Sequence, residues 1–275
     1  MIPFAYITEW RATAPWGSDA QVEQDLILSR AIVALYSDPE LSQQLGFRGG
    51  TALYKLFLQP PARYSEDLDF VQLEPGPIGA ILDGIRRVLD PWLGTPKRKM
   101  GEGRVVLMYR VTSETLPPVP MRLKVEINSR EHFAVFGIES REFSMRSRWF
   151  SGAAQVKTYQ LDELLGTKLR ALYQRKKGRD LFDLLVANQR AVVDSTRVVE
   201  CFMRYLEHEG LRVSRAEYER NLDEKLDDDV FLSDIAPLIA PDVPWSVEDA
   251  VALMRGRILP LLPGAPWKGT DSSSR

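Results

Sequence analysis

The sequence predicts an α+β protein in which a mixed-sheet lobe precedes a mainly helical lobe. Strand-like alternation and helical periodicity intermingle before residue 155, whereas the chain from residue 159 onward has mostly helical periodicity. A chain of 275 residues is long enough for two such lobes. We expect a catalytic lobe over 1–155, a helical lobe over 156–265, and a short, polar, disordered tail over 266–275.

The elements of the first lobe follow from periodicity and from the residues that interrupt it. Apolar side chains at helical spacing predict a helix over 20–36, followed by a turn and a short helix that ends near Gly46. The stretch 52–58 is helix-like and is ended by Pro60 and Pro61. The later elements are, in order, a strand over 64–73, a helix over 78–89, and strands over 104–112 and 121–128 that form a hairpin with a long loop.

The composition is that of an ordinary globular protein, with 44% hydrophobic and 27% charged residues. A net charge of −2 excludes a globally basic nucleic-acid binder, so any contact with nucleic acid must use a local patch. The one cysteine, Cys201, excludes an intramolecular disulfide and is expected to be a buried thiol. We expect a cytoplasmic protein without membrane contact, because the sequence has neither a signal peptide nor the roughly 18 apolar residues of a membrane span.

The strongest local motif combines Gly49-Gly50-Thr51 with Ser65-Glu66-Asp67-Leu68-Asp69. Two glycines before a helix allow close approach to a phosphate, and the helix N-terminus favours an anion. Thr51 can cap that helix or bind a phosphate oxygen. Asp67 and Asp69 project from one face of a strand, where hard oxygen ligands suit Mg²⁺, with Mn²⁺ as the alternative. Taken singly, the two motifs predict a tight turn and a solvated strand face; together they predict a nucleotide site with metal-assisted transfer.

A third carboxylate lies on the strand that contains Leu123, Val125 and Ile127 on one face. The opposite face carries Lys124, Glu126 and Asn128, which alone would describe the wet side of an antiparallel sheet. With the Asp-x-Asp strand present, Glu126 is predicted to be the third metal ligand.

A second motif lies in the helical lobe. Lys168, Ala171 and Arg175 form one stripe of a helix that Gly178 ends. Two interpretations are open for this segment: an exposed basic helix with ordinary salt bridges, or a triphosphate site in which Lys168 and Arg175 bind phosphate. In the second interpretation Asp180 and Asp183 orient the cations or act as base.

Positive charge is concentrated in the same segment, where six of the twelve residues from 168 to 179 are basic. This density predicts a contact surface for a phosphodiester backbone. The candidate RNA contacts are Arg170, Lys176, Lys177 and Arg179, and a second cluster that could extend them contains Arg86, Arg87, Lys97, Arg98, Lys99 and Arg104. The sequence contains no Walker A, kinase or Gly-x-Ser-x-Gly motif.

These motifs, in this order, resemble the AbiEii/AbiGii family of toxins, which includes mycobacterial tRNA nucleotidyltransferase toxins. The resemblance is carried by the Gly49 and Asp67 blocks, by Lys124-Val125-Glu126-Ile127, and by the Lys168-to-Asp183 pattern. It implies a nucleotidyltransferase-like (polymerase-beta-like) fold and transfer of a nucleoside monophosphate from an NTP. For some members the transfer adds pyrimidines to the 3′ acceptor end of tRNA and blocks translation.

The resemblance also implies roles for individual residues and a partner. Asp67 and Asp69 would hold the metal, Lys168 would bind the triphosphate in the cleft, and Asp180 or Asp183 would complete the site. An antitoxin encoded nearby is expected, and Ser65 corresponds to a position that such a partner modifies in some relatives. Two alternatives stay open: transfer onto a protein or small-molecule hydroxyl, and a non-catalytic nucleotide-binding interaction module. The motifs identify neither the NTP, nor the acceptor, nor the oligomeric state.

Overall fold

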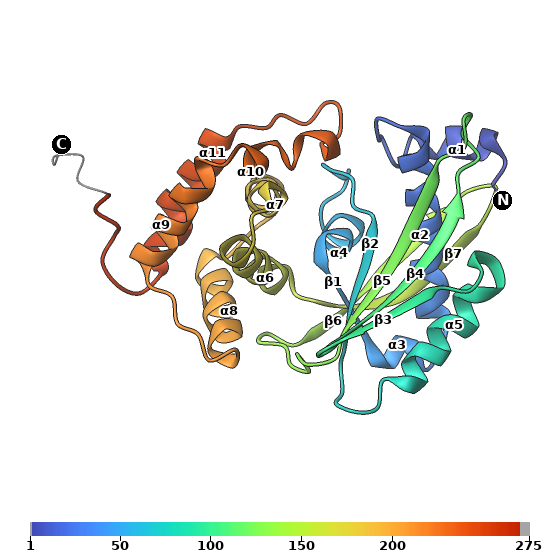
Figure 1. Ribbon diagram of the computed structural model, residues 1–275, viewed down its shortest axis with the longest axis horizontal. Helices are drawn as coiled ribbons and strands as arrows, with labels where there is room; N and C mark the ends of the chain where they lie inside the picture. The colour runs from blue at the N-terminus through green and yellow to red at the C-terminus, as the bar shows by residue number, and fades with distance from the viewer. Residues whose placement is uncertain (1, 270–275) are drawn as a thin grey trace. The chain divides into compact units, whose positions relative to one another are not determined.

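The computed structural model describes residues 2–269 and is shown in Figure 1. The chain divides into two compact units. The sheet unit comprises Met1–Gln160 and Leu238–Asp242, and the helical unit comprises Leu161–Pro237 and Val243–Arg275. Most of the tail predicted over 266–275 lies outside the described residues, because the description ends at residue 269. In the described chain, no helix combines the length and apolar character that crossing a bilayer requires.

The sheet unit contains a seven-stranded mixed sheet, which confirms the predicted α+β class. Its strand order is β3-β4-β5-β2-β1-β7-β6. The β2–β5 and β1–β7 pairs are parallel, and the other neighbours are antiparallel. The strands are β1 (Leu45–Arg48), β2 (Asp67–Gln72), β3 (Lys97–Gly101), β4 (Arg104–Thr112), β5 (Pro120–Asn128), β6 (Ile138–Arg146) and β7 (Ser151–Tyr159).

The sequence analysis found β2, β4 and β5 but missed the other four strands. β1 was assigned in part to a short helix, which ends instead at Gln44. Four residues with three consecutive buried positions cannot show the alternation by which a half-buried strand is recognised. β3 is exposed along its whole length, so no apolar face marks it. β7 begins with small residues, and its buried positions appear only toward its end.

The two faces of the sheet differ in what they contact. Leu68 and Phe70 of β2 are buried, and the Phe70 ring lies 6.2 Å from the ring of Tyr36 in α2. Asp67 and Asp69 alternate with them and therefore project from the opposite face, called here the carboxylate face. The helices of this unit are α1 (Phe4–Trp10), α2 (Asp19–Ser37), α3 (Leu41–Gln44), α4 (Gly49–Leu56) and α5 (Gly79–Leu93).

A buried charge joins α2 to α4. The Asp25 carboxylate of α2 accepts hydrogen bonds from the indole N–H groups of Trp10, at 2.9 Å, and Trp16, at 3.2 Å. It also lies 2.7 Å from Nζ of Lys55 in α4. Because Asp25 is buried, these partners are needed to compensate its desolvation. The network fixes the position of α4, whose first residues are the Gly49-Gly50-Thr51 motif.

Residues 238–242 return to the sheet unit late in the chain. Arg63 and Ile239 form an antiparallel bridge. The Tyr64 amide donates to the Leu238 carbonyl at 2.8 Å, and the Ala240 amide donates to the Ala62 carbonyl at 2.9 Å. This late segment therefore supports the loop that leads directly into Ser65 and β2.

The helical unit is built around α6, which packs against α7 and α8. Its core contains Tyr205 and Tyr218, whose hydroxyl groups donate to the Glu163 carboxylate and the Leu169 carbonyl. Cys201 is buried, as predicted. The helices are α6 (Leu161–Gln174), α7 (Gly178–Arg190), α8 (Ser195–His208), α9 (Arg215–Leu226), α10 (Asp229–Ser233), η1 (Ala236–Leu238, which ends in the sheet unit), α11 (Val247–Leu253), η2 (Met254–Ile258) and η3 (Leu259–Leu261).

Candidate active site

Three carboxylates meet on the carboxylate face where β2 and β5 lie side by side (Figure 1). The parallel register sets Asp67 opposite Lys124 and Asp69 opposite Glu126. Paired residues in neighbouring strands project from the same face, so the predicted ligands Asp67, Asp69 and Glu126 share one surface. All three side chains are half-buried. The parallel pairing is what brings the separate Asp-x-Asp and Glu126 motifs together.

Lys124 lies between two of these carboxylates. Its Nζ atom is 2.8 Å from Oδ2 of Asp67 and 3.4 Å from Oε2 of Glu126. Burial opposes the charged ammonium, but the hydrogen bond and negative charge of Asp67 outweigh it and raise the pKa of Lys124. The sequence analysis placed Lys124 on this face without giving it a role. Its alternation with Glu126 was the signal that could have identified it.

Asp69 lies in surroundings that oppose its ionisation. Burial, followed by the charge of Asp67, raises the pKa of Asp69 from 3.8 to about 6, while Lys124 and Arg48 oppose the shift. A divalent cation bound beside the three carboxyl groups would favour the ionised form of Asp69. Among the described residues, however, no three His, Cys, Asp or Glu side chains already stand together as a metal site. The donor chemistry fits Mg²⁺, and the Lys124 ammonium competes with such a cation for Asp67.

The Gly-Gly turn approaches Asp69 closely. Gly49 begins α4 directly after β1 and has a φ of +80°, a conformation that glycine adopts at little cost. A Cβ atom at Gly49 would collide with the Asp69 carboxylate, and one at Gly50 would collide with the Arg63 guanidinium. Arg48, at the N-cap position, makes no side-chain capping hydrogen bond. The first turn of α4 thus lies beside the carboxylates with an N-terminus suited to an anion.

Thr51 and Ser65 hold this turn against the start of β2. The Thr51 hydroxyl is buried and lies 2.9 Å from Oγ of Ser65 and 2.5 Å from the Asp67 carbonyl oxygen. It makes no capping bond to its own helix, so its observed contacts position β2. Ser65 is half-buried. Phosphate binding by Thr51 and modification of Ser65 stay predictions.

Two arginines near the turn were missed by the sequence analysis. Arg63 is buried and donates to the Tyr64 carbonyl at 2.9 Å. Arg48 pairs with Asp69 in the sheet register, and its guanidinium lies 2.6 Å from the Glu131 carboxylate. Both residues are separated from the recognised motifs by no more than a few positions, but no spacing rule distinguishes them from ordinary surface arginines.

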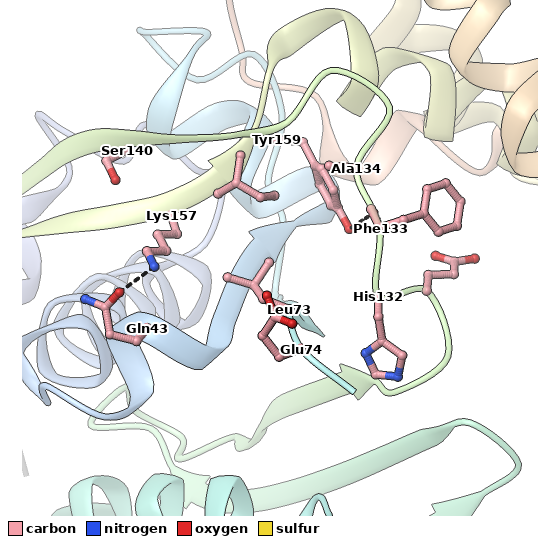
Figure 2. A pocket seen from close by; sticks show the side chains of 11 residues that line it. Gln43, Leu73, Glu74, His132, Phe133, Ala134, Ser140, Lys157 and Tyr159 are labelled. Carbon is pink, nitrogen blue, oxygen red and sulfur yellow. Dashed lines mark hydrogen bonds between the residues drawn. The ribbon is translucent and has the colours of Figure 1, made fainter. Parts of the chain in front are cut away.

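A pocket of about 360 Å³ is lined by residues of β6 and β7 and by the segments that follow β2 and β5 (Figure 2). This volume is within the usual range for small-ligand pockets, roughly 300–1,000 Å³. Figure 2 shows Lys157 and Gln43, whose Nζ and Oε1 atoms are 2.6 Å apart, and His132, whose Nδ1 atom is 2.8 Å from the Gln72 carbonyl oxygen. Glu131 also lines the pocket, so the Arg48–Glu131 pair connects it to Asp69.

The second motif forms a buried cluster within the helical unit. Nζ of Lys168 lies 3.1 Å from Oδ1 of Asp180 and 2.9 Å from Oδ2 of Asp183. Arg175 adds two hydrogen bonds to Asp180, at 2.7 and 2.9 Å. Burial opposes ionisation of Asp180, but the charges of Lys168 and Arg175 outweigh it and lower the pKa. The motif is thus a compensated charge network, and its role toward a triphosphate stays a prediction.

The candidate RNA contacts of the helical unit are paired with acids. Arg170 is buried and lies 2.9 Å from Glu209. Lys176 lies 2.8 Å from Asp228. Lys177 and Arg179 share Asp234, at 3.1 and 2.9 Å. Although burial opposes the shift, these hydrogen bonds lower the pKa of Asp234 to about 2. Most positive charge of this segment is therefore compensated within its own unit.

The comparisons with known proteins agree with this architecture. A family model described as the nucleotidyl transferase AbiEii toxin of a type IV toxin–antitoxin system matches residues 30–253. The structure is similar to the nucleotidyltransferase toxin MenT4 from Mycobacterium tuberculosis, with 19% identity, a TM-score of 0.66, and coverage of 99% of this chain and 91% of that one. It is also similar to JHP933 from Helicobacter pylori, with 20% identity, a TM-score of 0.51, and coverage of 86% and 89%. A search of curated proteins found no match.

Proposed function

The chain belongs to the AbiEii nucleotidyl transferase toxins of type IV toxin–antitoxin systems, and we propose that it modifies the 3′ end of tRNA. The protein is a nucleotidyltransferase, and membership of this family implies an antitoxin partner. The proposed reaction is Mg²⁺-dependent transfer of a nucleoside monophosphate from an NTP, with a pyrimidine favoured, so that the modified tRNA no longer supports translation. The preference for tRNA and for a pyrimidine comes from the family resemblance.

One observation carries the chemical part of this proposal: the Gly-Gly turn lies against Asp69, which shares one face of the sheet with Asp67 and Glu126. The turn offers helix amides to phosphate, and the carboxylates offer oxygen ligands to a cation. Asp67, Asp69 and Glu126 would hold Mg²⁺, which would neutralise phosphate charge and align the reacting groups. In the absence of the cation, Lys124 and Arg48 compensate part of the charge of the carboxylates.

In the proposed step, the oxygen of the terminal RNA hydroxyl forms a bond to the α-phosphorus of the NTP. The bond between that phosphorus and the bridging oxygen of the β-phosphate breaks, and pyrophosphate leaves. The hydroxyl proton passes to a carboxylate or to solvent. The residues of the sheet unit position the phosphates and keep the charge of the carboxylates compensated; the roles predicted for Lys168, Asp180 and Asp183 in this step stay proposals.

The test is incubation of the purified protein with total tRNA, Mg²⁺ and each α-labelled NTP in turn. We expect label on RNA with one pyrimidine NTP and none with Asp67→Ala. The matched control is Asp83→Ala, since Asp83 is an exposed aspartate on α5 and its removal should leave transfer unchanged. Expression of Asp67→Ala in cells should relieve toxicity.

The same experiment separates the alternatives. Label on protein instead of RNA would replace the proposed acceptor with a polypeptide. Bound nucleotide without transfer to any acceptor would favour a non-catalytic interaction module. Full transfer by Asp67→Ala would overturn the assignment of the carboxylate site.

A further inference from the structure

Beyond Lys124, the described residues of β3, β4 and β5 include five cations on the carboxylate face. Arg104 is paired with Glu126 at 3.6 Å. The other four are called here the basic strip: Lys97, Lys99, Arg110 and Arg122. The register sets Arg122 opposite Arg110 in the β4–β5 pair. It also sets Lys97 opposite Met108 and Lys99 opposite Val106 in the β3–β4 pair. Because Met108 and Val106 pair with Lys124 and Glu126, all four cations project from the same face as the carboxylates.

The basic strip is exposed and its charges are not compensated. All four side chains belong to exposed residues. Within residues 2–269, none of the four takes part in an ion pair. Three other members of the basic cluster seen in the sequence are paired: Arg86 with Asp90, Arg87 with Asp38 and Arg104 with Glu126. The remaining member, Arg98, projects from the opposite face of β3. The basic strip is therefore the set of cations on the carboxylate face of β3, β4 and β5 that remains available to an external anion.

Fold stability does not account for this arrangement. Like charges directly across two strands are destabilising, and Arg110 and Arg122 are such a pair. Lysine on an edge strand can prevent edge-to-edge aggregation, which would explain Lys97 and Lys99. That explanation does not extend to Arg110 and Arg122, which lie on inner strands of the sheet. An anionic ligand would compensate all four.

The basic strip is also suitably placed for a chain whose end reacts at the carboxylates. Arg122 is two residues from Lys124, about 7 Å along β5. β3 is three strands away from β2, about 14 Å across the sheet. A polynucleotide carries a phosphate at each residue, so it can reach the carboxylates and the basic strip at once, which a single nucleotide cannot.

We propose that the basic strip binds the phosphodiester backbone of the RNA acceptor and leads its 3′ end to Asp67 and Asp69. This inference rests on the proposed function, in that the acceptor is RNA. It specifies where the acceptor binds, namely on the carboxylate face of β3, β4 and β5 and not on the charge-compensated segment of α6 and α7.

The test measures binding of total tRNA without NTP, in an Asp67→Asn background that excludes transfer. The variant Lys97→Gln/Lys99→Gln removes two cations of the basic strip. The matched control, Arg98→Gln/Arg146→Gln, removes two exposed cations outside it, since Arg98 projects from the opposite face of β3 and Arg146 lies on the far edge strand β6. We expect the first variant to weaken binding on the order of tenfold and the control to bind like the parent.

The salt dependence gives a second readout. Removing two phosphate contacts should reduce the slope of log K against log salt by roughly 1.4 to 1.8. Equal weakening of tRNA binding in both variants, or no weakening in the strip variant, would overturn the inference. An acidic protein would then be the better candidate ligand of the basic strip. A transfer assay with labelled NTP, on Lys97→Gln/Lys99→Gln in the wild-type background, separates this inference from the proposed reaction. Labelled RNA with an unchanged KM for tRNA would refute the role of the basic strip alone. If RNA binds through the basic strip but is never labelled, the RNA-binding role of the strip would be supported and the proposed reaction refuted.

Discussion

Replacing Asp69 with asparagine is expected to stabilise the metal-free protein while abolishing transfer. The raised pKa of about 6 means that the folded protein holds the proton of Asp69 more tightly than the unfolded chain does. The ionised carboxylate therefore destabilises the fold, and this destabilisation grows as the pH rises from about 4 to about 6. Two pKa units correspond to about 3 kcal/mol. The gain from Asp69→Asn should be about 1 kcal/mol at pH ~4.5 and about 2 to 3 kcal/mol at pH ~8.

Urea unfolding in EDTA at both pH values measures this difference in unfolding free energy. Asp83→Asn is the control, because Asp83 is exposed and its replacement should change stability at neither pH. Adding Mg²⁺ at pH ~8 should stabilise the wild type more than Asp69→Asn, since only the wild type keeps the full ligand set. A variant that is less stable than the wild type at pH ~8, or whose gain does not depend on pH, would refute the electrostatic account of the site.

Three further predictions concern the turn, the buried cluster and the central lysine. Gly49→Ala should abolish transfer, because the left-handed backbone and the neighbouring carboxylate leave no room for a methyl group, whereas Gly79→Ala, in open space, should retain the wild-type rate. Lys168→Met should lower the unfolding free energy by about 3–5 kcal/mol, because the buried Asp180 and Asp183 lose the ammonium that they share, although Arg175 still pairs with Asp180; a variant as stable as the wild type in urea would contradict this. Lys124→Gln should raise the pKa of Asp69 further, which an NMR titration of the metal-free protein would detect as a shift above 6, and an unmoved titration would disprove it.

The sequence predicted the carboxylate site better than its surroundings. Alternation along the chain was enough to place Asp67 and Asp69 on one face and Glu126 on the wet face of another strand. It could not show that β2 and β5 are parallel neighbours, because pairing between distant strands leaves no local pattern. The pairing with β2 is what sets Lys124 opposite Asp67, so its place on the wet face of β5 did not reveal its contact with the site. Arg48 enters through a different pairing, that of β1 with β2, and β1 was itself missed.

Positive charge was the feature that the sequence described least well. The run from Lys168 to Arg179 is dense in the sequence, yet the acids that compensate it lie tens of residues away, at Glu209, Asp228 and Asp234. The basic strip has the opposite character, since its members are scattered over three strands and gather only in the folded sheet. Charge density along a chain reports composition, whereas charge available to a ligand depends on tertiary partners.

The late return of residues 238–242 to the sheet unit has a consequence for synthesis of the toxin. Loop residues 62–64, which precede Ser65 and β2, pair through their backbone with this late segment. A nascent chain on the ribosome therefore carries Asp67, Asp69 and Glu126 long before the loop beside them is supported. Contacts of such long sequence separation form slowly and late. The toxin should gain its competent site only near the end of translation, which leaves an interval in which a co-translated antitoxin can meet an inactive chain.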